Sequence, residues 1–526
     1  MAPRIVNVSS DFQAKLSVPA GNLRGRANLG ETHLDTLGSM NSLAQVLEAQ
    51  GRYEEAEALH RQGLEASRAK LGEKHPDTLA SMHNLASVLE AQGHHEEAEA
   101  LQRKELELSR AELGESHPDT LTSMNNLAVV LEARGRYDEA EALHRKVLQG
   151  RRAQLGETHP DTLASENNLA SVLEAQGRCA EAEALHRKEL ESCRARLGET
   201  HPETLTSMNN LATVLEDQGR NEEAEALHRE ALEGRRAKLG ETHPDTLTSM
   251  QSLSSILQEK GSYEEAEQLL RQTVKARRSK LGETHEDTLM SMHSLAIVLE
   301  DQERYEEAVA VLRQTLEGRR AELGETHSDT LTSMDKLASV LQARGSLEEA
   351  EKLCREALKS RRGKLGESHA DTLANIYDLG TLLVKKEEWA EAEELFREEL
   401  SKCRSANGSE HEETLSSEEK FAEFLKERGR LEEAEKLFRI VLKSRRAKLG
   451  NSHPDTMRSM YELGSLLTDK EDWEEAEQLF REELEKCRCV HGAEHEETIS
   501  STERFAEFLK DRGRKAESEE LLATLG

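Results

Sequence analysis

The nine residues LGETHPDTL occur at Leu155–Leu163 and again, unchanged, at Leu239–Leu247. The histidine of this stretch recurs at one fixed interval of 42 residues, at His33, His75, His117, His159, His201, His243, His285, His327, His369, His411, His453 and His495. A register held this long without insertion or deletion indicates an array in which each unit contacts only its neighbours. The sequence therefore predicts a quasi-one-dimensional repeat protein rather than several globular domains.

One 42-residue unit, His201–Thr242, shows what each repeat contains. Leu205, Met208 and Leu211 recur at spacings of three, the pattern of an amphipathic helix, and Gly219 ends it. We expect a first helix over 202–217, called the A helix, and a second, the B helix, that ends near 239–240. Each repeat is then a pair of antiparallel helices.

The stretch NNLATVLEDQGRNEEAEALHREAL, at 209–232, resembles a tetratricopeptide repeat in its leucine-then-small pair, its turn glycine and its B-helix alanine. The 42-residue period is similar to the longer subclass found in kinesin light chains and nephrocystin-type proteins. The resemblance covers residues 29–526, with the last repeat truncated. It implies an all-α, right-handed α-solenoid (superhelix) of about twelve 42-residue helix-turn-helix repeats, preceded by a degenerate or disordered leader at 1–28.

Composition limits the classes of protein that fit. Only 3% of residues are aromatic and 36% are hydrophobic, which predicts a thin core shared between layers. The net charge of −32 disfavours nonspecific binding to nucleic acid or anionic membranes. Six cysteines are too scattered for a disulfide framework and indicate reduced thiols in a cytoplasmic protein. No apolar stretch approaches 18 residues, so no membrane insertion is expected.

The repeated histidine has a structural and a catalytic interpretation. In the stretch 158–161, Thr158 could cap the helix with Asp161 closing a capping box, or His159 could cap it with Pro160 at the first helical position. Equivalent residues of successive repeats lie about 10 Å apart, too far for one zinc site. We expect a helix cap, with no catalytic residue, no metal and no cofactor.

The candidate binding residues are a row of asparagines. In arrays that the sequence resembles, A helices line the concave face, which would place there Asn84, Asn125, Asn126, Asn167, Asn168, Asn209 and Asn210. A carboxamide offers a donor and an acceptor, so such a row can pair with the backbone of an extended peptide. The alternative is that these asparagines bond between adjacent helices. Further along the chain, Glu419, Glu423 and Glu427 indicate basic ligands.

A second candidate surface is a row of arginines near the carboxyl end of each B helix, at Arg68, Arg110, Arg152, Arg194, Arg236, Arg278 and Arg320, called the arginine edge. Cations at this end complement the helix dipole, which is the structural interpretation. The same row could instead dock an acidic partner or a phosphate-rich surface.

The function predicted from the sequence is a noncatalytic scaffold or adaptor for peptide segments or domains of other proteins, and the resemblance adds the possibility of a kinesin-light-chain-like cargo adaptor. The alternative is a sensor or regulatory array whose NTPase effector domain is absent here, since no G-x-x-x-x-G-K-[ST] loop occurs. We expect protein or peptide partners, and neither nucleic acid nor a small-molecule substrate.

Overall fold

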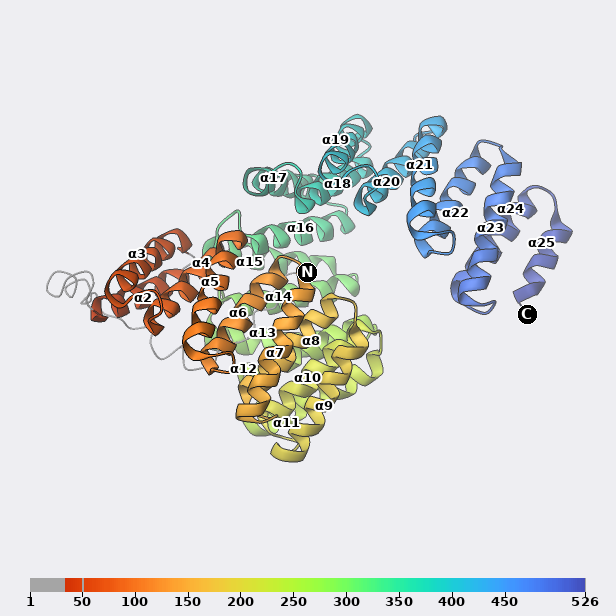
Figure 1. Cartoon of the computed structure of the whole chain (residues 1–526). Coiled ribbons are helices and arrows are strands. Elements are labelled where there is room, and N and C mark those ends of the chain that lie inside the picture. The colour runs from red at the N-terminus through yellow and green to blue at the C-terminus, as the bar shows by residue number, and fades with distance from the viewer. Residues whose placement is uncertain (1–33, 50–51, 526) are drawn as a thin grey trace. The chain divides into compact units, whose positions relative to one another are not determined.

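The computed structural model describes residues 34–49 and 52–525, and these residues form helices only (Figure 1). Twenty-four α-helices follow one another in the described ranges, with a short 3-10 turn, η2 (Ala523–Leu525), at the end. A helices of 16 residues alternate with B helices of 19 residues, apart from the shorter last one. The predicted all-α solenoid of helix pairs is confirmed.

The A helices are α2 (Leu34–Ala49), α4 (Pro76–Ala91), α6 (Pro118–Ala133), α8 (Pro160–Ala175), α10 (Pro202–Asp217), α12 (Pro244–Glu259), α14 (Glu286–Asp301), α16 (Ser328–Ala343), α18 (Ala370–Lys385), α20 (Glu412–Glu427), α22 (Pro454–Asp469) and α24 (Glu496–Asp511). The B helices are α3 (Tyr53–Leu71), α5 (His95–Leu113), α7 (Tyr137–Leu155), α9 (Cys179–Leu197), α11 (Asn221–Leu239), α13 (Tyr263–Leu281), α15 (Tyr305–Leu323), α17 (Leu347–Leu365), α19 (Trp389–Asn407), α21 (Leu431–Leu449), α23 (Trp473–His491) and α25 (Lys515–Leu522).

The bounds of α10 and α11 agree with those expected from the apolar spacing and the turn glycine. Gly219, between the two helices, has a φ of 73°, a left-handed conformation that glycine adopts without strain. Three later repeats keep this conformation with an acid, at Glu303, Glu387 and Glu471, whose φ angles are 59°, 62° and 63°. The turn geometry is thus held by the repeat and does not depend on glycine alone.

The core is thin and local, as the composition predicted. Ala212 and Ala224 are fully buried, which lets the helix axes of one repeat approach closely. Two later repeats place glycine at the A-helix position, and a phenylalanine fills the space. A Cβ on Gly380 would lie 2.6 Å from a ring carbon of Phe396. The two helices of a repeat therefore meet through matched small and large residues.

The chain divides into two compact units, Met1–Gln302 and Glu303–Gly526, within which residues contact one another more than they contact the other unit. The first contains α2 to α14 among its described residues, and the second contains α15 to α25. The leader predicted at 1–28 lies outside the described residues and stays a prediction. None of the described helices is long and apolar enough to cross a membrane.

Candidate peptide-binding face

The repeated histidine is a helix cap. His159 is the N-cap of α8, its Nδ1 accepts a hydrogen bond from the backbone N–H of Asp161 at 3.2 Å, and Pro160 is the first helical residue. The same bond recurs at the N-caps from His75 to His495, at 3.2 to 3.4 Å. Of the two capping alternatives, the structure therefore has the histidine cap and not the threonine cap.

The half-buried stripe on the A helices forms a face on which successive repeats come together. In α10 this stripe contains Thr206, Asn209, Asn210 and Thr213. α10 also contacts the A helices on both sides, α8 and α12, directly. We call the equivalent stripe on all A helices the A-helix face, and the predicted asparagines lie on it.

Carboxamides of adjacent repeats bond to one another along this face. Asn168 Nδ2 donates to Asn125 Oδ1 at 2.9 Å, and Asn210 Nδ2 donates to Asn167 Oδ1 at 2.9 Å. The ladder continues with Asn84 to Asn41 at 2.8 Å, Asn126 to His83 Nδ1 at 2.9 Å and Asn209 to Ser249 at 3.1 Å. Burial lowers the pKa of His83, which keeps that ring a neutral acceptor. The asparagines therefore do bond between adjacent helices.

This structural bonding leaves part of the carboxamides free in two of the pairs. Among the described residues, Asn168 Oδ1 and Asn125 Nδ2 take part in no hydrogen bond, and neither atom is sealed from solvent. The pair Asn210 and Asn167 has the same two atoms free. One acceptor and one donor per pair thus remain on the A-helix face. Whether they contact a ligand stays a prediction.

Arginines from the B helices lie beneath the A-helix face in many layers. Arg235 of α11 is only 7% exposed, and its Nη1 donates to Ser249 Oγ at 2.7 Å and to the carbonyl oxygen of Asp245 at 3.2 Å, both in the next A helix. The same pair of bonds recurs in the layers of Arg277, Arg319 and Arg445. These arginines join one repeat to the next.

In other layers the equivalent serine forms its hydrogen bond with a buried glutamate instead of an arginine. Ser207 Oγ lies 2.7 Å from Glu189 Oε1, and the position of Arg235 is taken there by Cys193. The layers of Glu105, Glu399 and Glu483 repeat the arrangement, with Ser109, Cys403 and Cys487 at the arginine position. Burial raises the pKa of the Cys403 and Cys487 thiols to about 11, so these thiols are unreactive structural groups.

The predicted acidic residues of the second unit have different roles. Glu419 is buried and paired with Arg445 at 3.0 Å and Arg458 at 3.3 Å. Glu423 has no ion pair among the described residues, and burial together with the charges of Glu462 and Glu419 raises its pKa. Glu427 is exposed. The A-helix face of this unit therefore carries unpaired acid at Glu423 but not at Glu419.

Most arginines of the arginine edge take part in ion pairs, either with a glutamate of the following turn, as Arg110 does with Glu115 at 3.4 Å, or with the next repeat. Arg194 contacts Glu230 at 2.8 Å, and equivalent pairs join Arg320 to Glu356 and Arg446 to Glu482. This pairing fits the structural interpretation of the edge, in which the cations also complement the helix dipole.

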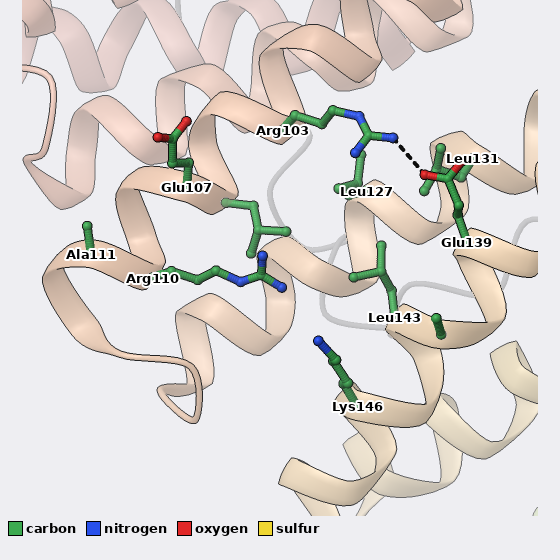
Figure 2. Close-up of a pocket in the computed structure, with 11 residues that line it drawn as sticks. Arg103, Glu107, Arg110, Ala111, Leu127, Leu131, Glu139, Leu143 and Lys146 are labelled. Atoms are coloured by element: carbon green, nitrogen blue, oxygen red, sulfur yellow. Dashed lines mark hydrogen bonds and ion pairs between the residues drawn. The ribbon is translucent and has the colours of Figure 1, made fainter.

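In three layers a lysine stands where Arg194 has its acid partner, at Lys104, Lys146 and Lys188. Figure 2 shows Arg110 and Lys146 pointing into one cavity of about 660 Å³ beside Leu127 and Leu143, while Arg103 is bonded to Glu139. The sequence analysis did not single out Lys146. Its signal is a lysine 36 residues after an edge arginine, where the layers of Arg194 and Arg320 have glutamate.

Comparison with family models identifies the fold class. The model of the tetratricopeptide repeat matches residues 35–111, 84–153, 119–195, 161–237, 209–279, 255–321, 329–405 and 413–488. These matches cover most of the chain, which therefore belongs to the tetratricopeptide repeat family. A comparison with curated proteins found no match.

Solved structures with similarity to this chain include repeat proteins of the kinesin light chain type, as the sequence resemblance predicted. TPR-like repeats from Podosopora anserina, described as a kinesin light chain, are 30% identical over 39% of this chain and 96% of that chain, with a TM-score of 0.37. BtubC (BKLC) from P. vanneervenii is 21% identical over 43% of this chain and 91% of its own, with a TM-score of 0.38. A human IFIT1 dimer with PPP-AAAA is 16% identical over 88% and 93%, with a TM-score of 0.43.

Proposed function

We propose that this chain is a noncatalytic protein-interaction scaffold of the adaptor type, and that its A-helix face binds an extended peptide segment of a partner protein. Membership of the tetratricopeptide repeat family supports the scaffold role. The proposal places the protein in the cytoplasm and gives it protein partners. The net charge of −32 argues against nucleic acid and anionic membranes as partners.

The observation that carries the proposal is the carboxamide ladder of the first unit. The pairs Asn168–Asn125 and Asn210–Asn167 each keep one acceptor and one donor open after bonding the two repeats together. Successive layers lie about 10 Å apart, and an extended chain advances about 3.3 Å per residue. A peptide running across the layers would therefore meet one open pair roughly every three residues. Such pairing recognises backbone rather than side chains.

The test is the triple variant Asn126→Ala, Asn168→Ala, Asn210→Ala in the full chain. The probe is a fluorescein-labelled dodecapeptide selected from a random library for binding to the unmodified protein. Each lost hydrogen bond contributes about 0.5 to 1.5 kcal/mol, so the loss of three should raise the Kd measured by fluorescence anisotropy roughly ten- to two-thousand-fold. Melting is followed by circular dichroism on the same samples, because the asparagines also join repeats.

Lys146→Glu is the matched control, because it places an acid where Glu230 stands in the layer of Arg194 and closes the alternative surface at Arg110. We expect it to leave the Kd unchanged. A lower melting temperature with intact affinity in the triple variant would show that the asparagines only join helices. Loss of affinity in Lys146→Glu alone would show that the ligand binds at the arginine edge.

A further inference from the structure

The second unit has a small cavity on its A-helix face, formed by α16, α17 and α18. Its volume is about 300 Å³, and its walls include Leu331, Asp335, Arg361, Asn375 and Asp378. The cavity belongs to one unit only and is separate from the carboxamide ladder of the first. It lies within the range of volumes that small ligand groups and single side chains occupy.

Asn375 is the unusual residue of this cavity. It occupies the position that holds serine in the other eleven repeats, such as Ser333 and Ser459. It is 2% exposed, and neither its Nδ2 nor its Oδ1 has a hydrogen-bond partner among the described residues. A buried polar atom without a partner destabilises the fold. A carboxamide with both atoms unpaired therefore calls for a partner that enters the cavity.

The arginine of this layer has turned away from the asparagine. In neighbouring layers the buried arginine bonds the serine of the next A helix, as Arg319 does with Ser333 at 2.7 Å. Arg361 instead forms a bidentate pair with Asp335, whose first bond, from Nη1 to Oδ1, is 2.9 Å long. The charge of Arg361 is thus neutralised inside the wall, and Asn375 is left facing the cavity.

The carboxylates that line the cavity outnumber its cations, with Asp335, Asp371 and Asp378 against Arg361 and Lys364. Asp378 has no ion pair among the described residues, and burial together with the charge of Asp335 raises its pKa. Lys364, at the same cavity, already donates to the carbonyl oxygen of Thr326 at 3.3 Å. With Arg361 paired, the cavity keeps an excess of acid, and Asp378 and Asn375 offer oxygen atoms that can accept hydrogen bonds.

The walls between these polar groups are apolar, from Leu331, Leu365 and Ala374. A long basic side chain has the matching form, with an aliphatic stem and a charged head. A guanidinium fits better than an ammonium, because its planar donors can reach a carboxylate and a second acceptor together. Acid elsewhere on the same unit's A-helix face, at Glu423 and Glu462, extends the complementarity along a basic segment.

We propose that this cavity binds an arginine side chain of a peptide lying on the A-helix face, with Asp378 and Asn375 Oδ1 accepting from the guanidinium and Asn375 Nδ2 donating to a peptide carbonyl. The inference rests on the proposed peptide-binding function and adds its side-chain specificity. The first unit then binds the backbone of the peptide, and this cavity recognises one type of side chain.

The experiment uses the full chain and labelled nonapeptides of glycine, serine and alanine that carry one central arginine. Matched peptides carry lysine, citrulline or glutamate there. Citrulline keeps the shape of arginine without its charge. By fluorescence anisotropy we expect arginine to bind at least tenfold more tightly than citrulline, with lysine between them and glutamate weakest. Equal binding of arginine and citrulline, or no binding of the arginine peptide at millimolar concentration, would overturn the proposal.

Two variants test the residues. Asn375→Ser restores the residue of the other eleven repeats, so we expect it to fold, to melt higher without ligand and to bind the arginine peptide at least tenfold more weakly. Asp378→Asn should weaken the arginine peptide and leave the citrulline peptide unchanged. Glu348→Gln is the control and should leave binding unchanged, because it removes an exposed acid of α17 that lies outside this cavity.

Unchanged affinity for the arginine peptide in both Asn375→Ser and Asp378→Asn would overturn the inference. A lower melting temperature in Asn375→Ser with unchanged affinity would show that ordered water satisfies the carboxamide. Failure here is distinguishable from failure of the proposed function. The library-selected dodecapeptide would still depend on the asparagines of the first unit if only the arginine site is wrong, and would not if the peptide-binding face itself is wrong.

Discussion

Glu105 makes the joint between α5 and α6 sensitive to pH. It is 6% exposed, and burial raises its pKa to about 7. Ser123 Oγ lies 2.5 Å from Glu105 Oε1 and 2.9 Å from the carbonyl oxygen of Asp119. The hydroxyl has one hydrogen and can satisfy only one of these acceptors. A protonated Glu105 donates its own hydrogen to the serine, which leaves the serine hydrogen for Asp119.

The size of the effect follows from the pKa of Glu105 in the two states. In the unfolded chain it has the ordinary value of 4.5, and in the folded protein it is about 7. Because the folded value is raised, the stabilisation is fully present below about pH 4.5 and is lost as the pH rises through 7. This difference between the two pKa values corresponds to roughly 3 kcal/mol for this one joint.

The assay is hydrogen exchange of α5 and α6 peptides by mass spectrometry at pH 5 and pH 8, corrected for intrinsic exchange rates. Protection should fall by roughly a hundredfold at the higher pH. Glu105→Gln, which is neutral at both values, should remove most of this difference. The α7–α8 joint is the internal control, because it has Val147 in place of Glu105 and Arg151 in place of Ser109. Equal pH dependence in the two proteins would refute the reasoning.

His159→Ala should lower the free energy of unfolding, measured by urea denaturation, by about 0.5 to 2 kcal/mol and leave peptide affinity unchanged. Stoichiometric zinc binding that disappears in this variant would contradict the capping role. Gly380→Ala should destabilise by about 1 to 3 kcal/mol, because its Cβ would lie 2.6 Å from the packed ring of Phe396. Gly363→Ala in α17, with no atom within 4 Å, should stabilise by about 0.5 to 1 kcal/mol, and equal melting shifts for the two glycines would argue against this packing.

The helices were predictable because their signals are local. The apolar spacing in 202–217, the turn at Gly219 and the histidine–proline start all act within one repeat, and α10 has the expected bounds. The choice between Thr158 and His159 as the cap was not predictable, because both side chains can reach backbone N–H groups from neighbouring positions. Only the geometry of the turn selects the histidine.

Bonds between repeats were less accessible from the sequence. Asn168 and Asn125 are 43 residues apart, and their contact depends on how two A helices stack. Ser207 and Ser249 both follow Leu-Thr and precede Met, although a glutamate approaches the first and an arginine the second. The sequence around the serine therefore did not distinguish the two kinds of joint. Asn375 was visible as the single departure from serine, but its meaning required its burial.

The two kinds of joint have an evolutionary consequence. The glutamate of one layer and the arginine of another reach the same serine hydroxyl, as Glu189 does at Ser207 and Arg235 does at Ser249. With either kind of B helix before it, the buried serine hydroxyl of the next A helix therefore has a hydrogen-bond partner. Unequal recombination that deletes or duplicates one 42-residue unit leaves a bonded joint on both sides, so the gene can change the length of the array in single steps while each surviving joint keeps its partners.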